Sequence, residues 1–113
     1  MYEEGYIDKF CHNNNLYDAF DCMVRFNQAI GLFMEYAFYH PDTFVLITAD
    51  HETGALSLRG GDPSKGNVKG SFSSGAHTGI PVPLFAYGPG SQYFMGIQEN
   101  SDVSNKIAEL LSK

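Results

Sequence analysis

The sequence has little of what marks several specialised classes of protein. Its two cysteines, Cys11 and Cys22, are too few for a disulfide framework. Seven Lys and Arg stand against 13 Asp and Glu, and the resulting net charge of −6 argues against nucleic acid as the main partner. No apolar run approaches the length of a transmembrane segment. Repeats, low-complexity tracts and linkers are also missing from the sequence.

The sequence begins without a signal peptide. Met1 is followed at once by Tyr2-Glu3-Glu4-Gly5, with no secondary structure ahead of it, so we expect the natural start to lie upstream. If so, the lack of a signal says nothing about the compartment. Apolar residues make up 43 % of the 113 residues, which is enough for the core of at most one small domain.

The stretch from Thr43 to Gly54 is the one around which the chain is organised. Its first part is an apolar, β-branched run, typical of a strand buried on both faces of a parallel sheet. Asp50 and His51 follow at its carboxyl end, where open α/β sheets place their sites, and both residue types bind zinc. A solvated turn that happens to contain Asp and His is the alternative.

Other possible metal ligands lie on either side of this stretch. Glu3 is followed by Asp8 and His12, and a spacing of four puts Asp8 and His12 on one face of a helical turn. A polar loop leading into a helix would explain the same residues. His77 lies 26 residues beyond His51, between small residues that let the backbone approach a ligand closely.

A long helix is predicted from about Leu16 to Tyr39, with Asn14 or Asn15 as its N-cap. His40 precedes Pro41, so the helix should end there, and we assign His40 no function. One apolar stripe recurs along this helix at spacings of three and four: Ala19, Met23, Phe26, Ile30, Phe33 and Ala37.

The remaining elements complete an α/β order. In chain order they are a short strand at 55–58, a turn-rich surface loop at 59–66, a buried strand at 84–87, and a helix at 102–111 capped by Asn100 or Ser101. The loop offers Arg59 and Lys65 as cations for an anionic substrate, although a solvated loop is the better interpretation.

Three motifs, in this order, resemble alkaline phosphatase: Glu3-x-Gly5-x-Ile7-Asp8-x-x-x-His12, then Thr48-Ala49-Asp50-His51-Glu52-Thr53-Gly54, then His77-Thr78-Gly79-x-Pro81-Val82-Pro83-x-x-x-Tyr87-Gly88-Pro89-Gly90. The resemblance covers nearly all of the chain but only the carboxyl-terminal part of the family's domain. It implies that residues 1–113 belong to one doubly wound α/β/α sandwich whose amino-terminal half is missing here.

The resemblance also implies a phosphomonoester hydrolase with two zinc ions and one magnesium ion. Asp8, His12 and His77 match the ligands of the first zinc, Asp50 and His51 match ligands of the second, and Glu3 matches a magnesium ligand. Two such zinc ions can clamp the attacking and leaving oxygens of a phosphoryl transfer. The family usually works outside the cytoplasm, and a homodimer is compatible with it.

The chain departs from the family's pattern in one large way. The nucleophilic serine, the arginine that grips phosphate and a bridging aspartate lie in the family's amino-terminal half, and none is found here. Ser73 and Ser74 lie close to His77 in sequence, but no family motif surrounds them. Cys11 could compete for zinc beside His12, although a thiol that points away is the better interpretation.

Two other functions stay open on the sequence alone. Cofactor-independent phosphoglycerate mutase has similar motifs, but its Asp-His pair is followed by Gly-Asn, whereas this chain has Glu52-Thr53-Gly54. A non-catalytic zinc-binding module is the other alternative. On the phosphatase interpretation, the isolated chain should have no phosphatase turnover, because it lacks the nucleophilic serine and the arginine.

Overall fold

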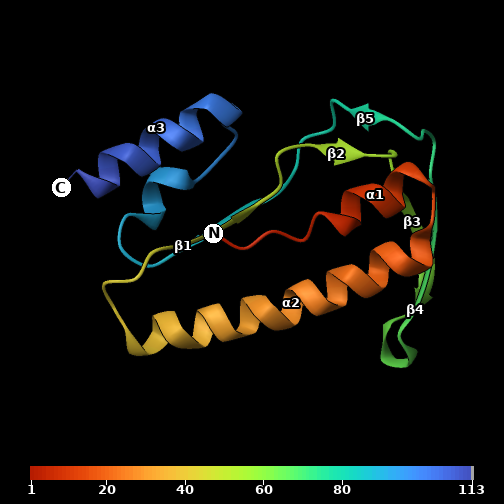
Figure 1. Ribbon diagram of the computed structural model, residues 1–113, viewed down its shortest axis with the longest axis horizontal. Helices are drawn as coiled ribbons and strands as arrows, with labels where there is room; N and C mark the ends of the chain where they lie inside the picture. Colours follow the sequence, from red (N-terminus) through yellow and green to blue (C-terminus); the bar gives the residue numbers. More distant parts are fainter. Residues whose placement is uncertain (113) are drawn as a thin grey trace. The chain divides into compact units, whose positions relative to one another are not determined.

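The chain contains both helices and strands, as the sequence predicts for the α/β class (Figure 1). The computed structural model describes residues 1–112, with the backbone alone at residue 63. The elements are α1 (Tyr6–His12), α2 (Leu16–Tyr39), β1 (Val45–Thr48), β2 (Glu52–Thr53), β3 (Ser57–Asp62), the 3-10 helix η1 (Pro63–Lys65), β4 (Asn67–Ser71), β5 (His77–Thr78), β6 (Leu84–Tyr87), the 3-10 helix η2 (Ser91–Phe94) and α3 (Asn100–Leu111). The chain divides into two compact units: Met1–Ala29 with His51–Pro81, and Ile30–Asp50 with Val82–Lys113.

Two small antiparallel sheets belong to the first unit. Strands β2 and β5 pair so that Thr53 lies opposite His77, and β3 and β4 form a hairpin that η1 closes (Figure 1). The turn-rich loop predicted at 59–66 is wrong for its first four residues, because strand β3 continues to Asp62; the turn itself is confined to 63–66. The two glycines indicate a loop in the sequence, yet both lie within the strand. Gly61 has φ +134, and a Cβ there would lie 2.2 Å from the Asn67 carbonyl oxygen, so this position of the strand requires glycine.

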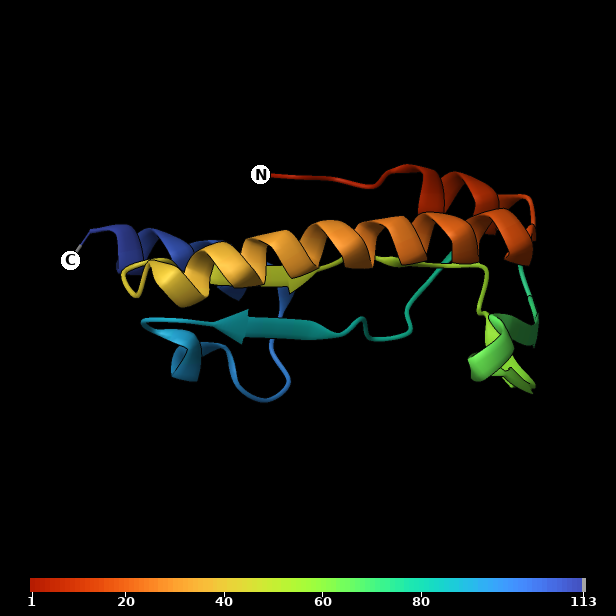
Figure 2. The ribbon, with the colours of Figure 1, turned by 90° about the horizontal axis from the view of Figure 1, so that it is seen from below.

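Strands β1 and β6 form the sheet of the second unit, and they run antiparallel (Figure 2). The strand at 84–87 is confirmed, but the parallel pairing expected from the apolar run is wrong. Thr48 at the end of β1 pairs with Leu84 at the start of β6, so no crossover helix is needed. The two strands are also not buried on both faces, since side chains of β6 alternate between half-buried and exposed.

Helix α2 begins and ends where the sequence predicts. Asn15 is its cap: the side-chain oxygen accepts a hydrogen bond from the backbone N–H of Asp18 at 3.2 Å. His40 follows the last helical residue, and its ring stacks on Tyr36 with centroids 4.0 Å apart. The apolar stripe is only partly buried, since Ala19 and Ala37 are buried whereas Met23 and Phe33 are 48 % and 44 % exposed.

Helix α3 begins two residues earlier than predicted, and its predicted cap is wrong. Glu99 is the N-cap, and its carbonyl oxygen accepts the N–H of Asp102 at 3.0 Å. The side chain of Asn100 instead donates to the backbone carbonyl of Asp50 at 2.9 Å. A long-range partner thus replaces the local capping bond that the sequence suggested.

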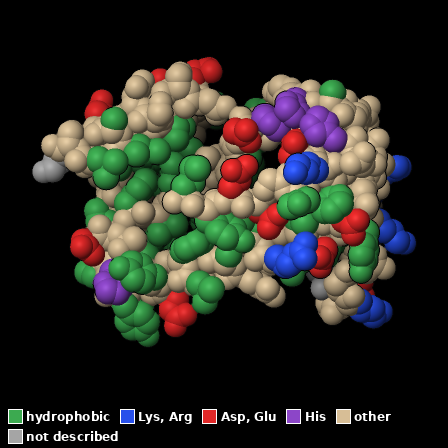
Figure 3. All heavy atoms as spheres, viewed as in Figure 1, with side chains coloured by type: hydrophobic (Ala, Val, Ile, Leu, Met, Phe, Trp, Pro, Cys, Tyr) green, Lys and Arg blue, Asp and Glu red, His purple; other side chains and the backbone are tan. Residues whose placement is uncertain are grey.

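The buried apolar set among the described residues is small: Cys11, Ala19, Cys22, Ala37 and Phe94. Large apolar side chains remain exposed on both units, including Tyr17 at 81 %, Phe38 at 70 % and Phe85 at 61 %. Figure 3 shows such side chains gathered over the region of β1 and α3. None of the described helices has the length and apolar character needed to cross a membrane.

Candidate metal centre

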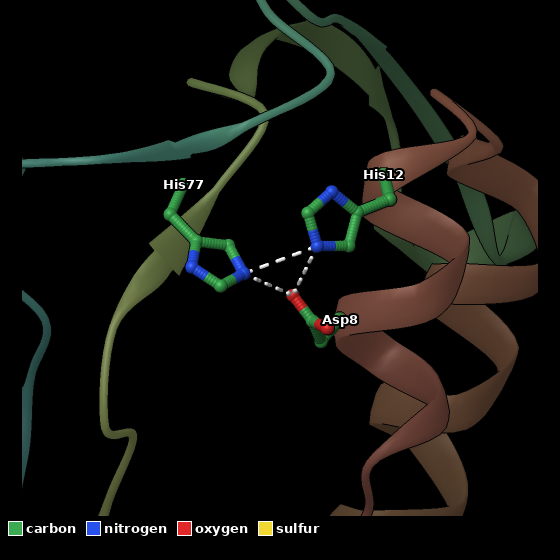
Figure 4. A group of neighbouring side chains, drawn as sticks. All are labelled: Asp8, His12 and His77. Atoms are coloured by element: carbon green, nitrogen blue, oxygen red, sulfur yellow. Dashed lines mark hydrogen bonds and ion pairs between the residues drawn. The ribbon is translucent and has the colours of Figure 1, made fainter.

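The short helix α1 presents two of the candidate ligands. Asp8 and His12 are one turn apart, so their side chains project from the same face of the helix (Figure 4). The helix ends at His12, and Asn14 then adopts φ +53, a left-handed conformation that Asn tolerates well. The chain reverses there and begins α2 at Leu16.

His77 reaches the same point from strand β5, and the three side chains converge (Figure 4). The Nε2 atoms of His12 and His77 are 3.1 Å apart, and each lies 3.4 Å from Oδ1 of Asp8. This is the group predicted from the sequence as the first zinc site. Figure 3 shows histidine side chains close together on this face of the first unit.

The other ring nitrogen of His12 is fixed by the backbone. Nδ1 donates a hydrogen bond to the Gly75 carbonyl oxygen at 2.7 Å, so the lone pair of the neutral ring is on Nε2, which faces the cluster. The loop that carries Gly75 is itself held at Gly54. The Gly54 carbonyl accepts the N–H groups of Ser73 and Ser74, and the Gly54 N–H donates to Ala76.

Asp8 is held by Thr53, whose hydroxyl donates to Oδ1 at 2.6 Å. This hydrogen bond lowers the pKa of Asp8, and the nearby rings of His12 and His77 lower it further when they are charged, against the raising effect of burial. The carboxylate is therefore ionised at neutral pH, which is the form that binds a metal ion.

His51 lies beside this cluster. Its ring stacks on that of His77 with centroids 3.6 Å apart, and its Nδ1 is 3.3 Å from the Thr53 hydroxyl. A side-chain hydrogen bond also joins β2 to β5: the Thr78 hydroxyl donates to the Glu52 carboxylate. This bond, with support from the Ala55 N–H, lowers the pKa of Glu52.

The three converging atoms fit a zinc ion. A tetrahedral zinc with nitrogen and oxygen ligands at about 2.0–2.1 Å holds those ligand atoms about 3.3–3.4 Å apart. The observed separations are 3.1, 3.4 and 3.4 Å. Two imidazole nitrogens and a carboxylate oxygen also suit zinc chemically, and three ligands leave a fourth position for water or substrate. Either a proton or a cation must lie among these atoms, because otherwise their lone pairs would repel.

The structure leaves the other candidate ligands outside this cluster. Within residues 1–112, the side chains that converge as a metal-binding group are those of Asp8, His12 and His77. Glu3 is exposed in the segment before α1. Asp50 is the last residue of the segment Ile30–Asp50, which belongs to the second unit. Their assignments, and the pairing of Asp50 with His51, stay predictions. Cys11 is buried and takes no part in the cluster; burial raises the pKa of its thiol.

Sequence reasoning missed the residues that hold the ligands in place. In the sequence Thr53 stands out only as part of a motif, and nothing there singles out the Gly75 carbonyl or the Thr78 hydroxyl. Cys11 and Cys22 are both buried free thiols.

Fold and site define an α/β chain with an Asp-His-His cluster of the kind that binds a divalent metal. The chain belongs to the alkaline phosphatase family, whose sequence model matches residues 1–71. It is 24 % identical over 178 residues to alkaline phosphatase 4 of Bacillus subtilis (strain 168), and 26 % identical over 111 residues to streptomycin-6-phosphate phosphatase of Streptomyces griseus. These matches cover 98 % and 78 % of this chain, but only 39 % and 23 % of the respective relatives.

Solved structures confirm the fold class. Alkaline phosphatase from the Antarctic bacterium TAB5 matches with a TM-score of 0.85 at 35 % identity, over 95 % of this chain and 33 % of that one. The cold-active enzyme from the psychrophile Shewanella sp. matches with a TM-score of 0.87 at 25 % identity, over 98 % of this chain and 44 % of that one. A mutant of the TAB5 enzyme, with a TM-score of 0.82 at 33 % identity, holds Mg in its M3 site. The chain thus has the α/β sandwich fold of these enzymes.

Proposed function

We propose that the protein containing this chain hydrolyses phosphate monoesters with bound zinc and magnesium, and that residues 1–113 are the carboxyl-terminal portion of its catalytic domain. The observation that carries the proposal is the convergence of Asp8, His12 and His77, with separations of 3.1–3.4 Å between ligand atoms. Membership of the alkaline phosphatase family supports the reaction class.

In this proposal the chain's own side chains bind and orient the metals. Asp8, His12 and His77 hold one zinc, Asp50 and His51 contribute to a second, and Glu3 contributes to a magnesium site. The zinc ions would supply Lewis-acid stabilisation of the phosphoryl oxygens. The hydrogen bond from His12 to the Gly75 carbonyl and that from Thr53 to Asp8 keep two of the ligands oriented.

The nucleophile is expected from the amino-terminal half of the domain. Neither Ser73 nor Ser74 is surrounded by the motif of a nucleophilic serine, and both backbone N–H groups are used to hold the loop at Gly54. The same half would supply the arginine that grips phosphate. We also propose an extracytoplasmic location and compatibility with a homodimer, both on the strength of the family.

Of the two alternatives, one is now less well supported. Family membership favours the phosphatase over a phosphoglycerate mutase. A non-catalytic zinc-binding module would use the same three ligands, so it must be separated by activity rather than by metal binding.

The test uses the full-length gene product and a chromogenic phosphate ester. His77→Ala should abolish turnover and reduce zinc content, because it removes one of three ligands. His40→Ala is the matched control, since His40 stacks on Tyr36 at the end of α2 and has no assigned function; it should leave both unchanged. Zinc binding without any turnover in the wild-type protein would favour the non-catalytic module.

A further inference from the structure

The Thr53 hydroxyl touches ligands assigned to two different metal sites. It lies 2.6 Å from Asp8 Oδ1 and 3.3 Å from His51 Nδ1. Thr53 is itself only 8 % exposed, so its hydroxyl cannot exchange these partners freely with water. No sequence pattern assigns the residue a role of its own.

The direction of these two hydrogen bonds follows from chemistry. An ionised carboxylate only accepts, so the single hydroxyl proton of Thr53 must point to Asp8. The hydroxyl oxygen then has only lone pairs to offer His51, and it accepts a proton from Nδ1. A relay results in which His51 Nδ1–H donates to Thr53 and Thr53 donates to Asp8. In this arrangement the neutral His51 ring carries its lone pair on Nε2.

His12 is held in the same tautomer by a different hydrogen-bond acceptor. There the Gly75 carbonyl accepts the Nδ1 proton at 2.7 Å, which also puts the lone pair on Nε2. A backbone carbonyl and a threonine hydroxyl thus play equivalent parts for two histidines. Outer hydrogen bonds of this kind fix the tautomer and ring orientation of metal ligands.

We propose that Thr53 is a positioning residue that fixes the tautomer of His51 and the orientation of Asp8, so that one hydroxyl couples the first zinc site to the second. This inference rests on the metal sites of the proposed function. The strand register supports it: Thr53 lies directly opposite His77 in the β2–β5 pair, so the residue that holds Asp8 also sits across from the third ligand of the cluster.

The first test reads the tautomer of His51 in the metal-free, full-length wild-type gene product by long-range ¹H–¹⁵N NMR. At about pH 8 an ordinary imidazole is neutral, so the two ring nitrogens can be told apart. The inference predicts a protonated Nδ1 on His51. A His51 ring protonated on Nε2 would overturn it, and this result needs neither a variant nor phosphatase activity.

The second test compares Thr53→Val, which keeps the shape but removes the hydroxyl, with Thr53→Ser, which keeps the hydroxyl. Thr53→Val should lower zinc affinity by about 10- to 100-fold in a chelator competition and give His51 a mixture of tautomers. Thr53→Ser should restore both. Thr48→Val is the matched control, because the Thr48 hydroxyl is exposed and donates to the Pro83 carbonyl; it should change neither.

These outcomes separate the inference from the proposed function. If the full-length wild-type protein binds no zinc, the metal sites are wrong, whereas the His51 tautomer still reports on Thr53. If zinc binds and Thr53→Val leaves both affinity and tautomer unchanged, the positioning role is wrong although the metal site stands.

Discussion

Gly54 holds the loop that orients His12, and replacing it with alanine should weaken the whole first unit. Its φ is +90, which L side chains rarely adopt. A Cβ at this position would lie 2.6 Å from a ring carbon of Phe72 and 3.3 Å from the Cys11 carbonyl oxygen. The same residue makes three backbone hydrogen bonds to the loop before His77, so a local shift would disturb that loop.

Two terms set the size of the effect. A non-glycine residue in such a conformation costs about 1–3 kcal/mol, and the overpacking against Phe72 costs about 1–3 kcal/mol more. We therefore expect Gly54→Ala to lower the free energy of unfolding by about 2–6 kcal/mol. Native proteins have only about 0.05–0.15 kcal/mol of unfolding free energy per residue, so a loss of this size is large.

Urea unfolding followed by circular dichroism measures this loss. Gly31→Ala is the matched control: Gly31 lies inside α2 with no atom within 4 Å of a built Cβ. It should raise stability by about 0.5–1 kcal/mol, because alanine is the better helix former. A Gly54→Ala midpoint equal to that of the wild type would refute the reasoning about φ and the contact with Phe72.

Three further results are expected. The isolated 113-residue chain should show no phosphatase turnover, because losing a nucleophile and a phosphate clamp removes several powers of ten in rate; zinc-dependent burst kinetics would contradict this and point to Ser73 or Ser74. The isolated chain should self-associate in size-exclusion chromatography, since few of its apolar side chains are buried and its strand edges are open. Its melting temperature should rise when zinc is added, because zinc stabilises the state that holds the ligands together. A monomer with a sharp, metal-independent melt would contradict this. Because the pKa of Asp8 is lower in the folded chain than its value of about 3.9 in the unfolded chain, Asp8 should add to the free energy of unfolding at pH values above about 3.9. This contribution should be lost as the pH falls through the lower, folded pKa. Thr53→Val should shrink that contribution, and an unchanged acid limb of stability against pH would argue against the hydrogen bond.

Elements set by local chemistry could be predicted from the sequence. Helix α2 is bounded by the Asn15 cap at one end and by Pro41 beyond the other, and both signals act within a few residues. Strand β6 is bounded by Pro83 and Gly88 in the same way. In these cases no distant contact opposes the local preference.

Pairing and partner choice could not be predicted, because they depend on residues far apart in the chain. An apolar run does not tell a parallel neighbour from an antiparallel one, and the pairing of β1 with β6 joins residues about 40 positions apart. The hairpin of β3 and β4 was hidden because Gly60 and Gly61 indicate a loop unless their strand partners are known. The side chain of Asn100 donates to the Asp50 carbonyl instead of capping α3, and this contact between distant residues could not be predicted either.

In the candidate metal site, too, some features follow from local spacing and others depend on contacts between distant residues. Asp8 and His12 are one helical turn apart, so their shared face follows from spacing alone. His77 could be proposed only through its motif, and its distance from the pair depends on the β2–β5 register. Thr53 and the Gly75 carbonyl orient the ligands through contacts that no spacing rule predicts.

The central claim is that Asp8, His12 and His77 bind zinc in this chain, and that this site is stronger than one built on Asp50 and His51. The most direct measurement is zinc affinity by chelator competition for the wild type, His77→Ala and His51→Ala, with His40→Ala as the control. His77→Ala should lose more affinity than His51→Ala, because it removes one of three converging ligands. Equal losses, or a larger loss in His51→Ala, would contradict the account.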